Sequence, residues 1–182
     1  MAIPEFLLER GFESVEPIGP GAMGAVYRCR RKTSTTVIKC VGADKGGDTF
    51  GPRFKREIRI LRELMHPNIV PIVAFNDSVP PYWLEMEYAP RGDLKKNIPG
   101  MLGDIDAIRD IFLQICNGVR YLHERPNPII HRDLKPRNIL IFEGRRAKIS
   151  DVGLAREVDR DTISLTYTGE WGGTFTICPQ SK

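Results

Sequence analysis

The sequence predicts an α+β fold, with an antiparallel β-sheet and one main helix in its first half and mainly helical structure in its second half. Two runs with strand character, residues 26–29 and 35–39, are separated by a short basic turn, as in a β-hairpin. Apolar residues recur at helical spacing in residues 54–64 and again in residues 105–124. The change from strand-rich to helix-rich sequence therefore indicates the fold class.

The composition is that of one globular domain able to bury a core, because 41% of the 182 residues are hydrophobic and 27% are charged. The 27 basic and 23 acidic residues leave a net charge of +4, which is too small and too dispersed to predict a nucleic-acid partner. No apolar run approaches the length of a membrane span, and Pro4 interrupts the start of the chain. We therefore expect neither secretion nor membrane insertion.

The cysteines lack both the C-x-x-C pairing of zinc or redox sites and the density of a disulfide scaffold. They are Cys29, Cys40, Cys116 and Cys178. Reduced thiols in a cytoplasmic protein are the expectation.

A glycine-rich segment precedes the first strand-like run, since Gly19, Gly21, Gly24 and Val26 fit the pattern G-x-G-x-x-G-x-V. The same glycine spacing occurs in dinucleotide-binding folds, but there the glycines open a helix. Here strand-like residues follow, which favours a hairpin that covers a phosphate site. Glycines would let backbone N–H groups approach phosphate oxygens closely.

Lys39 ends the second strand-like run, where its ammonium group could point toward phosphates. Glu57 lies in the helical pattern of residues 54–64, at the edge of the face that we expect to be buried. A pair with Arg53 on the same helix would contribute only about 0.2 to 0.5 kcal/mol. We favour an ion pair between Glu57 and Lys39, mainly because of the resemblance described below.

The second long helical pattern, residues 105–124, predicts a helix with one buried face. Prolines end it, and the runs 139–141 and 147–150 then read as a short hairpin around Glu143 and Gly144. This hairpin would bring Asn138 and Asp151 close together. The apolar positions of the predicted buried face are Ile108, Ile111, Phe112, Ile115, Val119 and Leu122.

The segment from His131 to Asn138 fits every fixed position of the pattern H-R-D-L-x-x-x-N, and Asp151-Val152-Gly153 follows. Phosphoryl transfer requires a carboxylate that accepts the proton of the acceptor hydroxyl, and oxygen ligands for magnesium. A charged surface turn before a strand is the alternative interpretation. Together with the glycine-rich segment and Lys39, these motifs resemble the catalytic domain of eukaryotic-type serine/threonine protein kinases. Lys135 followed by Pro136 resembles the serine/threonine-specific version of the loop.

The resemblance implies a two-lobed fold, with an N-terminal sheet lobe at residues 1–86, a hinge at 87–92 and an incomplete, mainly helical C-terminal lobe at 93–182. It implies ATP and Mg²⁺ as cofactors and serine or threonine hydroxyls of proteins as acceptors. By the same resemblance, Asp133 accepts the hydroxyl proton, Lys135 steadies the transferred phosphate, and Asn138 and Asp151 ligate magnesium.

The resemblance also implies which residues contact the nucleotide. Met86 would be the gatekeeper, and the backbones of Glu87 and Ala89 would bind the adenine edge. The full set of implied nucleotide-site residues is Ile18, Gly19, Gly21, Gly24, Val26, Val37, Lys39, Glu57, Met86, Glu87 and Ala89.

Three positions depart from the family pattern. Val152 stands where phenylalanine is usual, and Val37 where alanine is usual. Residues 172–180 start like the docking segment G-T-x-x-Y-x-A-P-E and then lose its register, and the chain ends at Lys182. The resemblance therefore implies a C-terminally truncated domain, in which the helix at residues 105–124 lacks much of its apolar cover.

Two further functions remain open beside an active kinase. An inactive fragment could still bind nucleotide or a protein partner that covers the incomplete lobe, and a small-molecule phosphotransferase of related fold is the third alternative. Arg132 beside Asp133 suggests control by phosphorylation, although the hydroxyls of the same loop could also stay unmodified. The candidate acceptors are Thr162, Ser164, Thr166, Tyr167 and Thr168.

Overall fold

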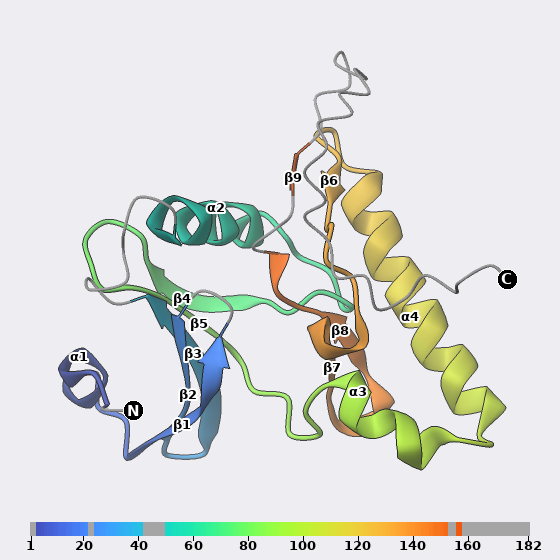
Figure 1. Ribbon diagram of the computed structural model, residues 1–182, viewed down its shortest axis with the longest axis horizontal. Helices are drawn as coiled ribbons and strands as arrows, with labels where there is room; N and C mark the ends of the chain where they lie inside the picture. The colour runs from blue at the N-terminus through green and yellow to red at the C-terminus, as the bar shows by residue number, and fades with distance from the viewer. Residues whose placement is uncertain (1–2, 22–23, 42–49, 153–155, 158–182) are drawn as a thin grey trace, which may run out of the picture.

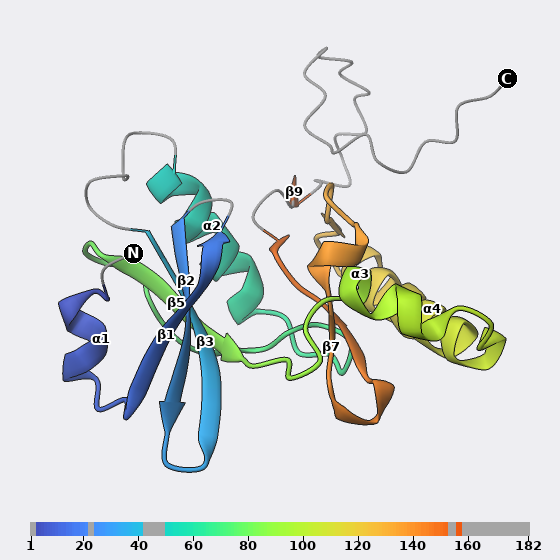
Figure 2. The same ribbon diagram turned by 60° about the horizontal axis from the view of Figure 1, so that its bottom comes forward.

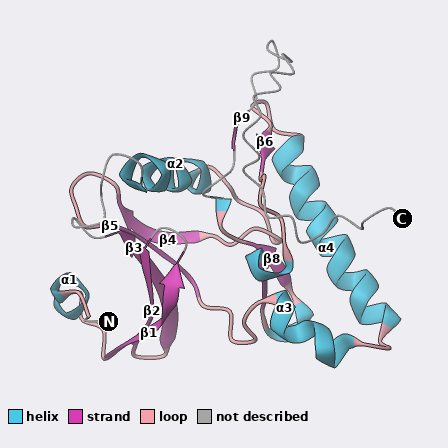
Figure 3. Cartoon of the chain, viewed as in Figure 1, coloured by secondary structure: helices cyan, strands magenta, loops and turns pink. Residues whose placement is uncertain are grey.

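The computed structural model describes residues 3–21, 24–41, 50–152 and 156–157. They form two parts, a sheet with helices beside it and a second part built around one long helix (Figure 1). Figure 3 shows the strands concentrated in the first part and the longest helix in the second. The predicted α+β fold class is confirmed.

The first part contains a five-stranded sheet of order β1-β2-β3-β5-β4, in which every neighbouring pair is antiparallel. The predicted hairpin is confirmed as the pairing of β2 with β3, with Tyr27 opposite Ile38 and the basic residues at its exposed end. The strands are β1 (Ser14–Gly21), β2 (Gly24–Arg31), β3 (Ser34–Val41), β4 (Ile72–Asn76) and β5 (Tyr82–Glu87).

Helices α1 (Glu5–Glu9) and α2 (Phe50–Arg62) lie on opposite sides of this sheet (Figure 2). Successive strand residues point to opposite faces, so Ile38 packs in the cluster that contains Leu7 of α1, whereas Val41 packs with Phe54 of α2. The sequence analysis did not predict α1. Its five residues are too few for a helical period to be detected, and the complete burial of Leu7 against the sheet stabilises it.

The second part begins with α3 (Leu94–Asn97), the 3₁₀ turn η2 (Ile98–Met101) and α4 (Ile105–His123). Asp104 caps α4 by accepting a 2.9 Å hydrogen bond from the backbone N–H of Ala107. The remaining elements are β6 (Ile129–Ile130), η3 (Pro136–Asn138), β7 (Ile139–Ile141), η4 (Glu143–Arg145), β8 (Ala147–Ile149) and β9 (Arg156–Glu157). The predicted hairpin is confirmed as β7 and β8, and β6 pairs with β9.

The predicted buried face of α4 is only partly correct. Ile111 and Leu122 are buried, but the side chains of Ile108 and Phe112 are 46% and 62% exposed. Among the described residues, β6, β8 and η2 pack against α4. These elements cover a narrower stripe than the apolar face of the helix, so Ile108 and Phe112 lie outside it.

The loop between α2 and β4 attaches the first part to the second. The Asn68 side chain donates a 2.9 Å hydrogen bond to the carbonyl of Ala147, and the Ile149 N–H donates to the Asn68 carbonyl at 2.8 Å. The His66 ring stacks on Tyr121 with centroids 4.8 Å apart, and its Nδ1 atom accepts a hydrogen bond from the Asn68 N–H. These contacts fix the distance between α2 and the β7–β8 hairpin.

None of the helices in the described ranges combines the length and the apolarity that crossing a bilayer requires.

Candidate active site

Lys39 on β3 and Glu57 on α2 form a buried ion pair. The Lys39 Nζ atom lies 2.9 and 2.8 Å from the two Glu57 carboxylate oxygens, and the two residues are 5% and 1% exposed. Burial by itself lowers the pKa of Lys39, but the carboxylates of Glu57 and Asp151 outweigh burial and raise it. Lys39 is therefore charged, and the predicted pairing with Glu57 is confirmed.

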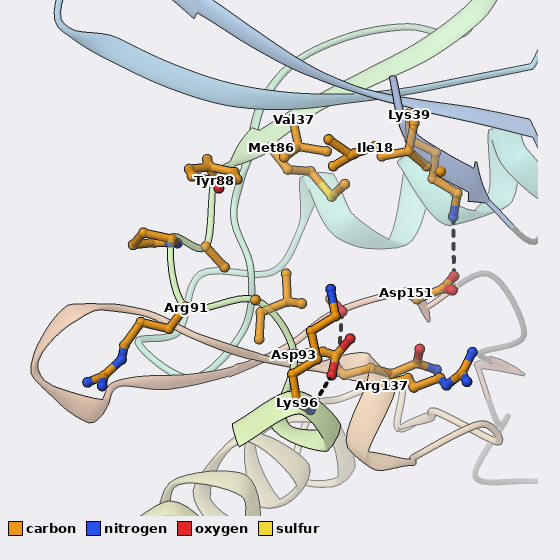
Figure 4. Close-up of a pocket in the computed structure, with 18 of the residues that line it drawn as sticks. Ile18, Val37, Lys39, Met86, Tyr88, Arg91, Asp93, Lys96, Arg137 and Asp151 are labelled. Atoms are coloured by element: carbon orange, nitrogen blue, oxygen red, sulfur yellow. Dashed lines mark hydrogen bonds and ion pairs between the residues drawn. The ribbon is translucent and has the colours of Figure 1, made fainter. Parts of the chain in front are cut away.

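Asp151 approaches the same ammonium group from the second part of the molecule. Its Oδ1 atom lies 3.2 Å from Lys39 Nζ, although the two residues are 112 positions apart in the sequence (Figure 4). Asp151 has a left-handed backbone, with φ of 60°, which costs a non-glycine residue about 1 to 3 kcal/mol. Ser150 holds the backbone here, since its N–H and hydroxyl both donate to the Asn138 carbonyl, at 2.8 and 3.1 Å.

In the segment from His131 to Asn138, the side chains of Asp133, Lys135 and Asn138 contact one another. The Asn138 side-chain nitrogen donates to the Asp133 carbonyl at 2.8 Å and to its carboxylate at 3.0 Å. The Lys135 ammonium donates to the same carboxylate at 2.7 Å. Asn138 and Lys135 therefore orient the Asp133 carboxylate from two sides. Asn138 also accepts both hydrogen bonds from Ser150, the residue before Asp151, which explains the predicted proximity of Asn138 and Asp151.

The His131 ring holds this loop through two hydrogen bonds. The sequence analysis did not assign it this role. His131 is buried, its Nε2 atom lies 3.0 Å from the Ser150 carbonyl, and its Nδ1 atom lies 3.3 Å from the Asp133 backbone nitrogen. Nε2 must donate and Nδ1 must accept, so the neutral ring fits. Burial lowers the pKa of His131. It outweighs the hydrogen bond to the Ser150 carbonyl and the nearby carboxylates of Asp151 and Asp133, which act in the opposite direction.

A cleft of about 590 Å³ lies between the two parts of the molecule. Ten predicted nucleotide-site or metal-site residues line it: Ile18, Gly19, Val26, Val37, Lys39, Glu57, Met86, Ala89, Asn138 and Asp151. Gly19 follows an irregularity in the pairing of β1, and its φ of 153° is a backbone angle that residues other than glycine rarely adopt.

The predicted nucleotide contacts of three further residues, Gly21, Gly24 and Glu87, stay predictions. The side chain of Glu87 pairs with Lys148 and does not line the cleft. The prediction for Glu87 concerned its backbone, so this contact does not test it. Gly21 and Gly24 flank Ala22 and Met23, which are outside the described residues.

The sequence analysis missed nine lining residues. Leu140 could have been found from the alternation along β7, because Ile139 and Ile141 are buried on the other face. The others carry no local signal that separates them from ordinary surface residues. The nine are Tyr88, Pro90, Arg91, Gly92, Asp93, Lys96, Arg137, Leu140 and Ser150.

The oxygen atoms of Asn138 and Asp151 are suited to a magnesium ion. The Asn138 amide nitrogen is used on Asp133, so its oxygen is the atom that can serve a cation. Within the ranges that the structure describes, no three His, Cys, Asp or Glu side chains are grouped to hold a metal by themselves. Magnesium commonly takes one or two protein ligands and completes its shell with phosphate and water, so the donor set fits.

Several predictions fall on residues outside the described ranges. They concern Gly153, the phosphorylation candidates from Thr162 to Thr168, the docking segment at 172–180 and Cys178. Val152 is described, and it is buried in the main hydrophobic core. Control by phosphorylation through Arg132 therefore stays a prediction.

Comparison with known proteins identifies the family to which this chain is similar. The family model described as the protein kinase domain matches residues 12–173. Cell division control protein 2 homolog 1 of Trypanosoma brucei brucei is 37% identical over 149 residues, 80% of this chain and 48% of that protein. Calmodulin-binding receptor-like cytoplasmic kinase 1 of Arabidopsis thaliana is 34% identical over 155 residues, 82% of this chain and 33% of that protein.

A third relative, the serine/threonine-protein kinase RUNKEL of Arabidopsis thaliana, is 32% identical over 167 residues, 91% of this chain and 12% of that protein. The chain therefore spans less than half the length of each of these three relatives.

Proposed function

Because this chain belongs to the protein kinase domain family, we propose that it transfers the γ-phosphoryl group of ATP to serine and threonine hydroxyls of protein substrates. The observation that carries the proposal is the convergence of Lys39, Glu57 and Asp151 on one side of the cleft. Asp133 and Asn138 lie close by on the adjoining loop. Phosphoryl transfer depends on positioning and electrostatic stabilisation, which these groups can supply.

The apolar walls of the cleft suit the adenine ring. Val26 and Val37 line it from the sheet, and Leu140 lines it from the β7–β8 hairpin. Met86 on β5 lies beside Val37, its partner across the strands, in the position proposed for the gatekeeper. We propose that the backbones of Glu87 and Ala89 bind the adenine edge and that Gly19, Gly21 and Gly24 cover the phosphates.

Lys39 would bind the phosphates, with Glu57 holding its ammonium group in place. Asn138 and Asp151 would hold Mg²⁺, which when bound offsets negative charge on the phosphate oxygens. The Asp151 carboxylate already faces the side of the cleft where Lys39 lies (Figure 4).

Asp133 would orient the acceptor hydroxyl and accept its proton. Its carboxylate is held by Asn138 and Lys135. Lys135 would then steady the phosphate that is being transferred, because a mobile ammonium can leave one carboxylate for a more highly charged neighbour.

The division into a sheet lobe at 1–86, a hinge at 87–92 and a second lobe at 93–182 is part of the proposal. The cytoplasm is the proposed location. The described cysteines Cys29, Cys40 and Cys116 are free thiols, which fits a reducing compartment. Burial raises the pKa of the Cys29 and Cys40 thiols to about 11, so these two stay protonated at neutral pH.

A phosphoryl-transfer assay tests the proposal. The purified chain is incubated with Mg²⁺, γ-labelled ATP and a mixed protein substrate, beside an Asp133→Asn variant. We expect the substitution to lower the incorporated label by a factor of about 10² to 10⁴, because it removes the proposed base. Asp106→Asn, which changes an exposed carboxylate on α4, is the matched control and should keep full activity.

Equal labelling by the wild-type chain and Asp133→Asn would rule out the proposed role of Asp133. Nucleotide binding without any transfer by the wild-type chain would instead support the alternative of an inactive fragment.

A further inference from the structure

Positive charge gathers on the side of the cleft that belongs to the second part of the molecule. Arg91, Lys96 and Arg137 line this side, and all three are exposed. Lys96 and Arg137 lie on the floor of the cleft with Asp93, and Arg91 lies farther along the same side (Figure 4). They come from two segments of the chain, the stretch from Arg91 to Lys96 and the turn η3 that contains Arg137, which meet at this surface.

The carboxylates that line or adjoin the cleft have other contacts. Glu57 and Asp151 both contact Lys39, and Asp133 contacts Lys135. Asp93 caps α3 by accepting a 2.9 Å hydrogen bond from the Lys96 backbone N–H. Among the described residues, no carboxylate lies within ion-pair distance of the side chains of Arg91, Lys96 or Arg137.

These cations lie near the catalytic carboxylate. Arg137 is four residues after Asp133, and the side chain of its neighbour Asn138 lies 3.0 Å from the Asp133 carboxylate. The position of α3 is fixed by Asn97, whose side chain donates to the carbonyls of Arg91 and Asp93 at 2.8 and 2.7 Å. Helix α3, which carries Lys96, packs against η3, which carries Arg137. A polypeptide that presents a hydroxyl to Asp133 would therefore lie beside the surface that these two side chains share.

We propose that the protein substrate is acidic around the acceptor hydroxyl, with aspartate or glutamate side chains bound by Arg137 and Lys96 and by Arg91 farther out. This inference rests on the proposed function and names the chemistry of its substrate. Unpaired exposed cations attract carboxylates and repel basic sequences, so they select among substrates by charge. The attraction is screened by salt, because all three side chains are exposed.

A peptide assay tests the charge preference. Three peptides share one serine in an otherwise neutral frame and differ only in the flanking residues, which are aspartate, alanine or lysine. With saturating Mg-ATP and the wild-type chain, we expect kcat/KM to fall in the order aspartate, alanine, lysine. High salt should reduce the differences.

Two charge-reversal variants test which side chains cause the preference for acidic peptides. Lys96→Glu and Arg137→Glu should each lower kcat/KM for the aspartate peptide about two- to fivefold, the effect of one exposed charge pair, and raise it for the lysine peptide. Lys95→Glu is the matched control, since Lys95 is the neighbouring exposed residue of α3 but does not line the cleft. Arg137→Lys keeps the charge and should keep the preference, which separates charge from a role in folding.

Fluorescence anisotropy of the labelled peptides, with a non-hydrolysable ATP analogue present, measures the same preference without turnover. Phosphorylation of all three peptides at equal rates, or faster phosphorylation of the lysine peptide, would overturn the inference and leave the kinase activity standing. If Lys96→Glu raises the KM for ATP but leaves the peptide preference unchanged, the inference is also overturned, because Lys96 then binds the nucleotide and not the peptide. Absence of label in every substrate would instead refute the proposed function.

Discussion

Lys39 is a charged amine in a place where burial alone disfavours charge. It is compensated by Glu57, which is itself almost completely buried, and by Asp151. A buried pair of this kind contributes little net stability when intact, because desolvation offsets the attraction. Removing one partner is costly, since the other charge remains buried without compensation.

Lys39→Met should therefore lower the free energy of unfolding by about 3 to 5 kcal/mol. The double variant Lys39→Met/Glu57→Leu should recover most of this loss, because no buried carboxylate remains unpaired. Urea denaturation of the wild-type chain, both single variants and the double variant forms the complete cycle. Losses that simply add in the double variant would show that the two side chains do not interact.

His131 gives the fold a dependence on pH. Its pKa in the folded state is lowered from the ordinary 6.5 by burial, so the unfolded chain takes up the proton first as the pH falls. Stability should be complete above about pH 6.5 and decline below it, with a slope of at most about 1.4 kcal/mol per pH unit from this one group. Protonation at Nδ1 would also remove the acceptor for the Asp133 N–H.

The contribution of His131 is measured by denaturation of the wild-type chain and His131→Asn between about pH 7.5 and 5.5. The variant should lose less stability over this range than the wild-type chain does. His123→Asn changes an exposed histidine of α4 and is the control. Identical pH profiles for the wild-type chain and His131→Asn would contradict the assignment.

Among the elements, α4 approaches the β7–β8 hairpin and the loop after α2 through Gly118. A Cβ atom at this position would lie 2.8 Å from the Ile149 side chain and 2.9 Å from the Asn68 carbonyl oxygen. That carbonyl accepts the Ile149 N–H, so it cannot move without loss of a backbone hydrogen bond. The close approach of three elements therefore depends on the missing side chain.

Gly118→Ala should destabilise the chain by about 1 to 3 kcal/mol, despite the better helix propensity of alanine, because the added methyl group overpacks this contact. Gly100→Ala is the control, since an added Cβ there meets nothing within 4 Å. Thermal denaturation of both variants measures the difference. A Gly118→Ala variant as stable as the wild-type chain would show that the elements can separate at little cost.

At the scale of the whole molecule, apolar side chains with large exposed fractions lie along α4 and just before it, among the described residues of the second part. Ile105, Ile108 and Phe112 are exposed, whereas Ile111 on the same helix is buried. Exposed apolar surface of this kind favours association and the binding of hydrophobic dyes.

The double variant Ile108→Lys/Phe112→Lys should bind less 8-anilinonaphthalene-1-sulfonate than the wild-type chain does. Each substitution should change the free energy of unfolding by at most about 0.5 kcal/mol relative to the wild-type chain, because both side chains are already exposed. Ile111→Lys, in contrast, should cost about 3 to 5 kcal/mol by burying an unpaired charge. Unchanged dye binding in the double variant would show that this face is covered in solution.

Features with a local signature could be predicted from the sequence. The hairpins at β2–β3 and β7–β8 and the helix α4 follow from residue periodicity and turn residues, which depend on neighbours within a few positions. The motif from His131 to Asn138 likewise identifies candidate catalytic groups, because the order of side chains in one loop is itself the signal.

Tertiary structure alone determined the rest, since it depends on residues far apart in the chain. Which part of the α4 apolar face is covered depends on what packs there, and the left-handed backbone of Asp151 depends on the Asn138–Ser150 contacts. The meeting of Lys39 with Asp151 requires three-dimensional placement, and so does the lack of a carboxylate, among the described residues, beside Lys96 and Arg137 at the cleft. Local sequence determines which elements form, whereas long-range packing determines which of their side chains meet and which charges remain for a partner.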